Sequence, residues 1–340
     1  MKILVGISGG VDSAVCANRL ISLGHDVSGA VLVMHEYTEI DEAREVCNSL
    51  GIPLFTVDCR ERFELVKADF RNEYMNGRTP NPCVICNEKV KMRCLLDYAL
   101  EHGFDMIATG HYASLSTNES TGRRCISVAL DPRKDQSYML YRLPEDILSH
   151  LVLPLGDSLK TGVREEALDA EIPVANRKDS QEICFLPDGG YADYVESIEG
   201  KSREGYFIDE SGNVISPHKG IANYTVGQRK GLGVSLGERA FVTDIDPDSG
   251  NITLSTSDWG CTKLRVTSLV YQAYNPVSAM ETYRLKVKLR YSAPLVDTVV
   301  TVYSDGRAEL SFDSPVKAAP GQSAVFYDEG SIAFGGIIVK

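Results

Sequence analysis

The sequence predicts an α/β domain with a doubly wound parallel sheet, followed by a small, mainly β connector and a C-terminal β-barrel. Short apolar runs alternate with helical patterns over residues 3–109, as in a parallel sheet covered by helices. Glycines crowd residues 200–237, where helical signals are few. Beyond residue 262, short alternating runs separated by turn residues are typical of an antiparallel barrel. We therefore expect three domains, at residues 1–195, 196–262 and 263–340.

The individual elements follow from these patterns. In the first domain the expected strands are residues 3–7, 26–33, 54–57 and 106–109. The first expected helix begins at residue 11, the second opens at residues 38–41 and ends at residues 50–51, and two more cover residues 61–75 and 88–100. Residues 38–41 (Thr-Glu-Ile-Asp) indicate a capping box before the second helix. The expected barrel strands are residues 283–289, 296–303, 308–312, 323–327 and 332–339.

Composition limits the class of protein. A chain of 340 residues with 43% hydrophobic and 24% charged residues is typical of a soluble globular protein. No apolar run approaches the ~18 residues of a membrane helix, and residues 1–4 lead straight into the first strand, so we expect a cytoplasmic protein with no membrane contact. The odd number of cysteines, nine, favours metal or redox chemistry over a disulfide framework. The net charge of −12 means that any RNA would bind through local basic patches.

A glycine turn joins the first strand to the first helix at residues 8–13 (Ser-Gly-Gly-Val-Asp-Ser). Adjacent glycines let the backbone approach an oxyanion, and the free N–H groups of a helix N-terminus point toward it. Ser8 and Ser13 add hydroxyl donors, and Asp12 is suited to hold Mg²⁺ on phosphates. The pattern predicts a phosphate-binding loop, although an ordinary glycine-rich turn is the alternative.

This loop lacks the lysine of the Walker motif. It resembles the PP-loop of the ATP pyrophosphatases, which implies that ATP is split between its first two phosphates and AMP is transferred to an acceptor oxygen.

Three cysteines stand out from the other six. Residues 78–87 (Arg-Thr-Pro-Asn-Pro-Cys-Val-Ile-Cys-Asn) contain two prolines that stiffen an extended loop. Cys86 precedes the helix expected from residue 88, so we expect the helix dipole to lower the pKa of its thiol. Cys184, within residues 178–185, is a second candidate. The remaining cysteines are expected to be structural: Cys16, Cys47, Cys59, Cys94, Cys125 and Cys261.

Together these motifs resemble those of the tRNA-specific 2-thiouridylases, the MnmA family, over nearly the whole chain. The supporting segments are residues 8–13, 78–87, 108–112, 134–138, 178–185, 224–233 and 319–327. The resemblance implies that ATP adenylates O2 of the wobble uridine in tRNA and that sulfur then replaces this oxygen. It implies ATP and Mg²⁺ as cofactors, with tRNA and either a sulfur-donor protein or free sulfide as partners.

The resemblance also implies roles for individual residues. ATP would contact Gly6, Ile7, Ser8, Gly9, Gly10, Val11, Asp12, Ser13, Leu32 and Gly110. The target base would face Asn81, Pro82 and Cys83. The tRNA would contact His111, Lys134, Asp135, Gln136, Arg290, Tyr291 and Gln322. Cys86 and Cys184 would form the catalytic pair.

One position departs from the better-known family pattern, Asn-Pro-Asp-x-x-Cys-Asn. Here Cys83 replaces the aspartate, which creates a Cys-x-x-Cys motif with Cys184 as a distant third thiol. Three thiolates suit a 4Fe–4S cluster with one open iron, so Cys83, Cys86 and Cys184 are candidate ligands. The alternative is a persulfide relay between Cys86 and Cys184 without a cluster. A structural zinc would need a fourth ligand.

Other functions explain less of the sequence. Another PP-loop adenylating enzyme of RNA modification is the nearest alternative. Amidotransferase-type and lysidine synthetases transfer nitrogen and need no paired thiols. A non-catalytic RNA-binding or iron–sulfur scaffold protein would leave the PP-loop unexplained.

Overall fold

The first domain is built on a five-stranded sheet in the order β3-β2-β1-β4-β7. The computed structural model describes residues 1–36, 38, 40–177, 183–186, 190–234, 237–257 and 259–340. The strands are β1 (Lys2–Gly6), β2 (Asp26–Val33), β3 (Leu54–Asp58), β4 (Met106–Ala108) and β7 (Leu151–Val152). Every neighbouring pair is parallel, which confirms the predicted class of sheet.

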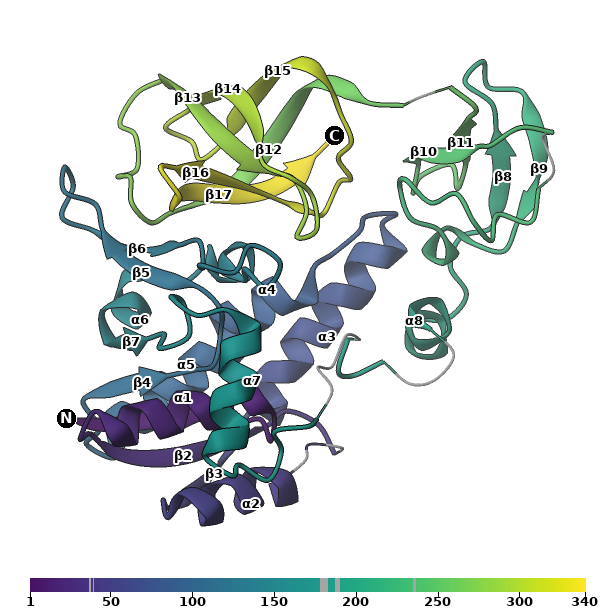
Figure 1. Ribbon diagram of the computed structural model, residues 1–340. Coiled ribbons are helices and arrows are strands. Elements are labelled where there is room, and N and C mark those ends of the chain that lie inside the picture. The colour runs from purple at the N-terminus through teal and green to yellow at the C-terminus, as the bar shows by residue number, and fades with distance from the viewer. Residues whose placement is uncertain (37, 39, 178–182, 187–189, 235–236, 258) are drawn as a thin grey trace.

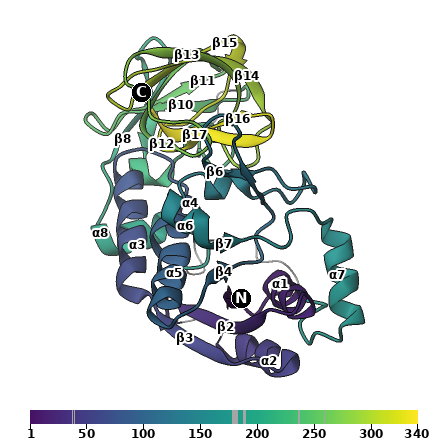
Figure 2. The same ribbon diagram turned by 90° about the vertical axis from the view of Figure 1, so that its left-hand side faces the viewer.

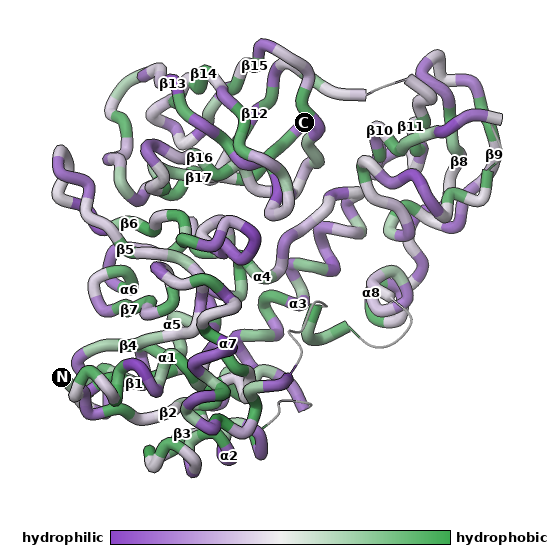
Figure 3. The backbone as a smooth tube through the Cα atoms, viewed as in Figure 1, coloured by the Kyte–Doolittle hydropathy of each residue, from purple (hydrophilic) through white to green (hydrophobic). Residues whose placement is uncertain are grey.

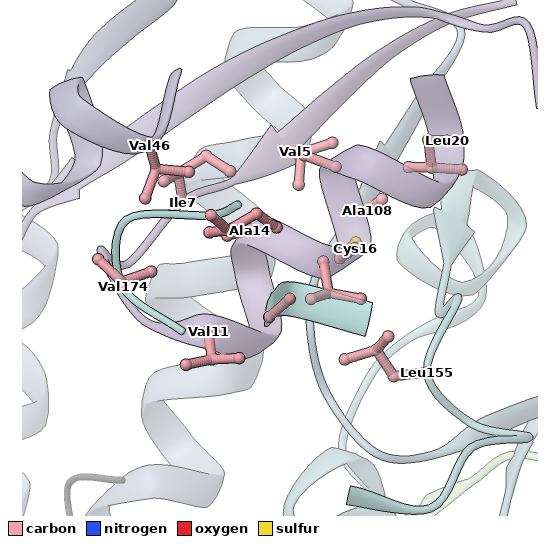
Figure 4. Packing of buried hydrophobic residues seen from close by; sticks show 14 of the residues in the cluster. Val5, Ile7, Val11, Ala14, Cys16, Leu20, Val46, Ala108, Leu155 and Val174 are labelled. Carbon is pink, nitrogen blue, oxygen red and sulfur yellow. The ribbon is translucent and has the colours of Figure 1, made fainter. Parts of the chain in front are cut away.

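Helices cover both faces of this sheet, as the doubly wound prediction requires. Ile3 and Val5 of β1 pack on one face with side chains of α1 (Val11–Ser22), α2 (Ile40–Leu50) and α7 (Lys160–Asp169). Figure 4 shows this packing around α1. Leu4 points to the opposite face, among side chains of α5 (Met92–Glu101) and α6 (Glu145–His150). The continuous burial of Ile3, Leu4 and Val5 along β1 is therefore explained by a helix layer on each side of the sheet.

One local prediction needs correction, and another lies partly outside the described residues. The helix expected from residue 88 begins at Pro82, because α4 (Pro82–Cys86), the π-helical η1 (Asn87–Lys91) and α5 follow one another directly. Proline is favoured in the first helical turn, where its missing N–H is not needed. The predicted capping box includes residue 39, outside the described residues, and the Thr38 hydroxyl turns back to donate to the His35 carbonyl at 2.9 Å.

The C-terminal strands close into a barrel, as predicted, but residues 261–271 add a sixth strand to the five that the sequence indicated. The ring runs β12-β15-β14-β13-β16-β17 and closes through β12–β17 pairing. Its strands are β12 (Cys261–Tyr271), β13 (Glu281–Lys288), β14 (Val296–Val302), β15 (Ala308–Val316), β16 (Ser323–Asp328) and β17 (Ser331–Val339). Buried and exposed side chains alternate along β15, and Figure 3 shows the change between hydrophobic and hydrophilic residues along the barrel strands.

A hairpin of the first domain extends the barrel sheet. Its strands, β5 (Ser114–Thr117) and β6 (Arg124–Ser127), pair with each other, and β6 pairs with β17 through Ser127 and Ser331. Their hydroxyls share a hydrogen bond of 2.9 Å. The barrel therefore sits directly on the first domain, as Figures 1 and 2 both show.

The connector carries a second, smaller sheet in the order β10-β11-β8-β9. Its strands are β8 (Gly205–Ile208), β9 (Val214–His218), β10 (Phe241–Ile245) and β11 (Ile252–Ser255), and the preceding helix α8 (Tyr191–Glu199) spans the expected boundary between residues 195 and 196. The helix α3 (Arg60–Met75) reaches toward it from the first domain (Figure 1), and a side chain at Gly77 would meet Ile245 at 2.5 Å. Within the described ranges, no helix is both long and apolar enough to cross a membrane.

Candidate functional site

The loop after β1 folds as an anion-binding turn. Gly9 has a φ of +75°, a conformation that glycine adopts without strain. The Ser13 hydroxyl donates to the Gly10 carbonyl at 3.0 Å and accepts the Ser8 N–H at 3.1 Å, which fixes the turn. Gly10 is the N-cap of α1 and offers no side-chain cap, so the first turn of α1 can donate its N–H groups to an anion.

A close backbone contact sets the wall opposite this loop. A Cβ atom added to Gly110 would lie 2.6 Å from the Asp12 carbonyl carbon and 2.8 Å from the Ser13 nitrogen. Only glycine lets the chain leaving β4 approach the first turn of α1 this closely. The predicted nucleotide residue Gly110 therefore lies against the loop.

Asp12 has two partners that the motif did not reveal. Both of its carboxylate oxygens lie 2.7 Å from the Lys160 ammonium nitrogen, and the Tyr112 hydroxyl donates to Oδ1 at 2.8 Å. Lys160 opens α7, 148 residues away in sequence, and its side chain is only 8% exposed. No sequence motif pointed to Lys160, because its proximity to Asp12 depends on the packing of α7 against α1.

A cavity of about 840 Å³ joins the loop to the cysteine region. The residues expected to bind ATP that line it are Gly6, Ile7, Ser8, Asp12, Ser13, Leu32 and Gly110. His111, Gln136 and Cys184 line the same cavity. Gly9, Gly10 and Val11 complete the turn beside it. The cavity therefore brings a phosphate-binding turn and a thiol to a common space.

The three candidate cysteines lie near one another around a lysine. Cys83 and Cys86 are on α4, and Cys184 comes from the segment 183–186, with Cys83 and Cys184 exposed and Cys86 buried. Lys91, at the end of η1, also lines the cavity, and its charge acts on all three thiols. Burial alone would lower the pKa of Lys91, but the neighbouring cysteines raise it. The residues expected at 178–182 lie outside the described residues.

The prediction of a lowered pKa for Cys86 is wrong. Burial raises the pKa of its thiol to about 12, and the charge of Lys91 offsets only part of this effect. The reason is the early start of the helix at Pro82, which places Cys86 inside a continuous helical run instead of before its N-terminus. Its sulfur instead contacts the sulfur of Met34 at 3.9 Å. Desolvation also raises the pKa of Cys184.

Two of the other cysteines, Cys59 and Cys94, pack in the same buried cluster as Cys86 and form a side-chain hydrogen bond with each other. Cys16, Cys47, Cys59, Cys94 and Cys125 are buried, and Cys261 is partly buried. Within the described part of the chain, no group of three His, Cys, Asp or Glu side chains is arranged to hold a metal ion.

His111 is a neutral histidine in the cavity wall. Its Nδ1 lies 2.9 Å from the Thr109 hydroxyl. Burial, helped by the charge of Lys91, lowers the pKa of His111 to about 3. At neutral pH this side chain can therefore donate and accept hydrogen bonds without adding charge to the cavity.

The expected tRNA residues of the segment 134–136 have defined positions. The Gln136 side-chain oxygen accepts the Tyr112 N–H at 2.9 Å, so this glutamine is fixed in the cavity wall. Asp135 is buried, accepts the Ser137 hydroxyl at 2.9 Å and lies 3.7 Å from the Lys288 ammonium of the barrel. Lys134, beside them, is partly buried.

The barrel holds the loop that ends at Asn81 and leads into α4, where Pro82 and Cys83 lie. Gln322 Nε2 donates to the Thr79 carbonyl at 2.8 Å. Asn81 Nδ2 lies 3.6 Å from the Met139 sulfur, which fixes the loop from the other side. The remaining expected tRNA residues are Arg290, which is exposed, and Tyr291, which lies 5.8 Å beneath the Lys288 ammonium.

A parallel α/β domain with a glycine turn at the carboxyl end of its central strand, facing the Cys184 thiol across one cavity, is typical of the PP-loop class of nucleotide-binding protein. Family models match the chain in three parts: a tRNA methyl transferase HUP domain at residues 1–188, a tRNA methyl transferase PRC-barrel domain at residues 192–256 and an aminomethyltransferase beta-barrel domain at residues 261–339.

Curated relatives match over the full length. The tRNA-specific 2-thiouridylase MnmA of Acetivibrio thermocellus is 39% identical over 355 residues, covering 99% of each chain. The tRNA-specific 2-thiouridylase MnmA 1 of Clostridium tetani is 41% identical over 354 residues, covering 99% of this chain and 96% of the relative. The MnmA of Desulforamulus reducens is 39% identical over 359 residues, covering 100% and 97%. The chain belongs to the MnmA family.

Proposed function

We propose that this protein is an ATP-dependent tRNA-uridine 2-sulfurtransferase that makes 2-thiouridine at the wobble position. The observation that carries the proposal is the cavity of about 840 Å³ that Ser8, Asp12 and Ser13 line at one side and Cys184 at another. Activation of an oxygen by ATP and its replacement by sulfur both need access to the same atom. A shared cavity supplies that access.

The first step is adenylation. The uridine O2 attacks the α-phosphorus of ATP, the bond to the β-phosphate breaks, and pyrophosphate leaves. The carbonyl oxygen is a poor leaving group, whereas AMP is a good one, so this step prepares C2 for attack by sulfur. The residues proposed to hold ATP are those of the turn at 6–13, with Leu32 beside the adenine and Gly110 beside the turn.

Mg²⁺ fits the oxygen ligands available here, since Asp12 provides a carboxylate beside the turn. When bound, Mg²⁺ would neutralise phosphate charge.

Sulfur transfer uses the thiols of Cys86 and Cys184. In the persulfide form, the outer sulfur on Cys184 attacks C2 and AMP departs with the oxygen. The Cys86 thiolate then attacks the Cys184 sulfur, the S–S bond breaks, and its electron pair remains on the sulfur of the uridine. The resulting disulfide is reduced by an external dithiol. Lys91 provides a cation next to these sulfur anions.

Cys83 adds a third thiol, which allows a second mechanism of sulfur transfer that uses an iron–sulfur cluster. Three thiols are the ligand type of a 4Fe–4S cluster, although the described side chains are not arranged to hold a metal ion. When bound, such a cluster would supply an iron that carries the sulfide. Cys83, Cys86 and Cys184 would hold it, whereas Cys83 is dispensable in the persulfide form.

The tRNA would lie over the three domains proposed at residues 1–195, 196–262 and 263–340, each of which carries a sheet of its own. We propose that Asn81 and Pro82 face the target base. His111, Lys134, Asp135, Gln136, Arg290, Tyr291 and Gln322 are the proposed tRNA contacts. The sulfur comes from a donor protein or free sulfide in the cytoplasm, where ATP and tRNA are present.

The test measures pyrophosphate release and 2-thiouridine formation with ATP, tRNA and a sulfur donor. Release of pyrophosphate that depends on tRNA supports the proposal, and its absence contradicts an adenylating enzyme. Asp12→Ala should abolish the release. Cys184→Ser should abolish 2-thiouridine while pyrophosphate release continues, whereas Cys261→Ser, a change outside the cavity, should leave both intact.

A further inference from the structure

The turn at residues 8–13 contains no cation, although it is proposed to hold a polyanion. Its residues are Ser-Gly-Gly-Val-Asp-Ser, and its single charge, on Asp12, is negative. Phosphates bound there would meet a carboxylate unless a nearby positive charge balances it. The ammonium of Lys160 lies next to the Asp12 carboxylate and can supply this charge.

Lys160 lies directly behind the Asp12 carboxylate. Its ammonium is 2.7 Å from both oxygens, and its side chain is 8% exposed. Three features fix its approach. The Asp131 carboxylate accepts the backbone N–H of Lys160 at 3.2 Å, and the Tyr112 ring lies 5.6 Å from the Lys160 ammonium. The Tyr112 hydroxyl also donates to Oδ1 of Asp12, one of the two oxygens that the ammonium contacts.

We propose that Lys160 is the phosphate-binding cation of this loop, and that its ammonium passes from the Asp12 carboxylate to the leaving pyrophosphate when ATP binds with Mg²⁺. The inference rests on the proposed adenylation. A divalent ion competes with Lys160 for the Asp12 oxygens, because Mg²⁺ is a hard cation that prefers oxygen ligands such as a carboxylate. The ammonium then has N–H donors for the phosphate oxygens that lie against the turn.

The role of Lys160 in the reaction is to balance charge on the leaving group. As uridine O2 bonds to the α-phosphorus, the bond from this phosphorus to the bridging oxygen breaks. Its electron pair moves onto the β-phosphate, and the Lys160 ammonium donates a hydrogen bond there. No proton or electron leaves the lysine.

Neighbouring cations have different surroundings. Arg177 donates to the Gly9 carbonyl at 3.2 Å and lies 3.8 Å from the Glu42 carboxylate. Lys91 lines the cavity beside the thiols. Lys160 alone among these three contacts the carboxylate that is proposed to hold the metal.

The test compares binding of Mg²⁺-pyrophosphate and of AMP to the full-length protein by calorimetry, without tRNA or a sulfur donor. Lys160→Met should weaken pyrophosphate binding by about tenfold or more, since one charge-assisted hydrogen bond is lost, and change AMP binding by less than about twofold. Lys160→Gln, which keeps an N–H donor for Asp12 and so favours folding, should show the same loss. Lys201→Met, which removes an exposed ion pair of 3.0 Å with Glu196, is the matched control.

Two results would overturn the inference. Unchanged pyrophosphate binding in both variants would mean that Lys160 does not bind the phosphates. Equal losses of AMP and pyrophosphate binding would mean that it supports the shape of the cavity. The binding assay contains no tRNA, so either result would contradict the role of Lys160 without contradicting the proposed thiolation of tRNA. In the same way, a failure to detect thiolation would not change the measured binding of pyrophosphate.

Discussion

Gln322 of the barrel donates a hydrogen bond from Nε2 to the carbonyl oxygen of Thr79 at 2.8 Å, across 243 residues of sequence. The contact is reciprocal, because the Thr79 N–H donates to the Pro320 carbonyl at 2.8 Å. Gly321, with a φ of +90°, permits this approach, since a Cβ there would lie 2.9 Å from the Thr79 nitrogen. The barrel therefore fixes the loop that leads to Cys83.

Gln322→Ala should impair thiolation more than nucleotide binding. The change releases the Thr79 carbonyl and loosens the loop, so we expect kcat/KM for tRNA to fall by about tenfold, the equivalent of one hydrogen bond lost. ATP affinity should remain within about twofold, because the turn at 8–13 does not contact Gln322. Thr282→Ala, on an exposed face of the barrel, is the control. An equal loss of both quantities would contradict a loop-positioning role.

A buried glutamine holds the barrel on the first domain. Gln272 is fully buried, and its Nε2 donates to the carbonyls of Leu140 and Tyr141 at 2.9 and 3.0 Å. Its Oε1 accepts the Ile126 N–H at 2.9 Å. The Gln272 side chain, which belongs to the barrel, thus forms hydrogen bonds with buried backbone groups of the first domain.

Gln272→Leu should be strongly destabilising. The buried carbonyls and the N–H lose their partners, and each unsatisfied group costs about 1–3 kcal/mol, so the free energy of unfolding should fall by about 3 kcal/mol or more. Denaturant unfolding measures this loss. Gln228→Leu, which removes only bonds to Thr225 and Lys230 nearby in sequence, should cost less than about 1 kcal/mol. Similar costs for the two variants would contradict the proposed link between the domains.

Local patterns predicted the parallel sheet and the barrel because the periodicity of a strand or a helix depends on residues that are close in sequence. The residues that they could not predict are joined by long-range packing. The Lys160–Asp12 pair spans 148 residues, the Gln272–Ile126 bond spans 146, and β6 joins the barrel sheet through Ser331.

Site prediction met the same limit. The motif at residues 8–13 carries the phosphate-binding groups within one short segment, and half of its residues, Ser8, Asp12 and Ser13, line the cavity. The pKa of Cys86 was predicted in the wrong direction because it depended on a helix boundary, which is the least certain feature of any sequence pattern. Moving the helix start to Pro82 removed the free N–H groups that would have favoured the thiolate.

His111 should make the protein sensitive to acid. Its folded-state pKa, about 3, lies below the ordinary value of 6.5, so the unfolded chain binds a proton before the folded one does. The resulting loss of stability is absent above about pH 6.5 and grows as the pH falls toward 3, reaching about 1–2 kcal/mol at pH 5. His111→Gln should reduce the stability difference between pH 7 and pH 5 by this amount. The exposed His102→Gln should leave the difference unchanged, and an equal effect of both variants would contradict the prediction.

Cys83 distinguishes the two forms of sulfur transfer. Protein purified and reconstituted without oxygen should bind about four iron atoms per chain if a cluster forms, and Cys83→Ala should lose both the iron and 2-thiouridine formation. Pyrophosphate release should continue in this variant, because adenylation needs no thiol. In the persulfide form, iron-free protein thiolates tRNA equally well from a persulfide donor and Cys83→Ala keeps its activity. Cys125→Ser, at a buried site apart from the cavity, controls for the loss of a thiol as such.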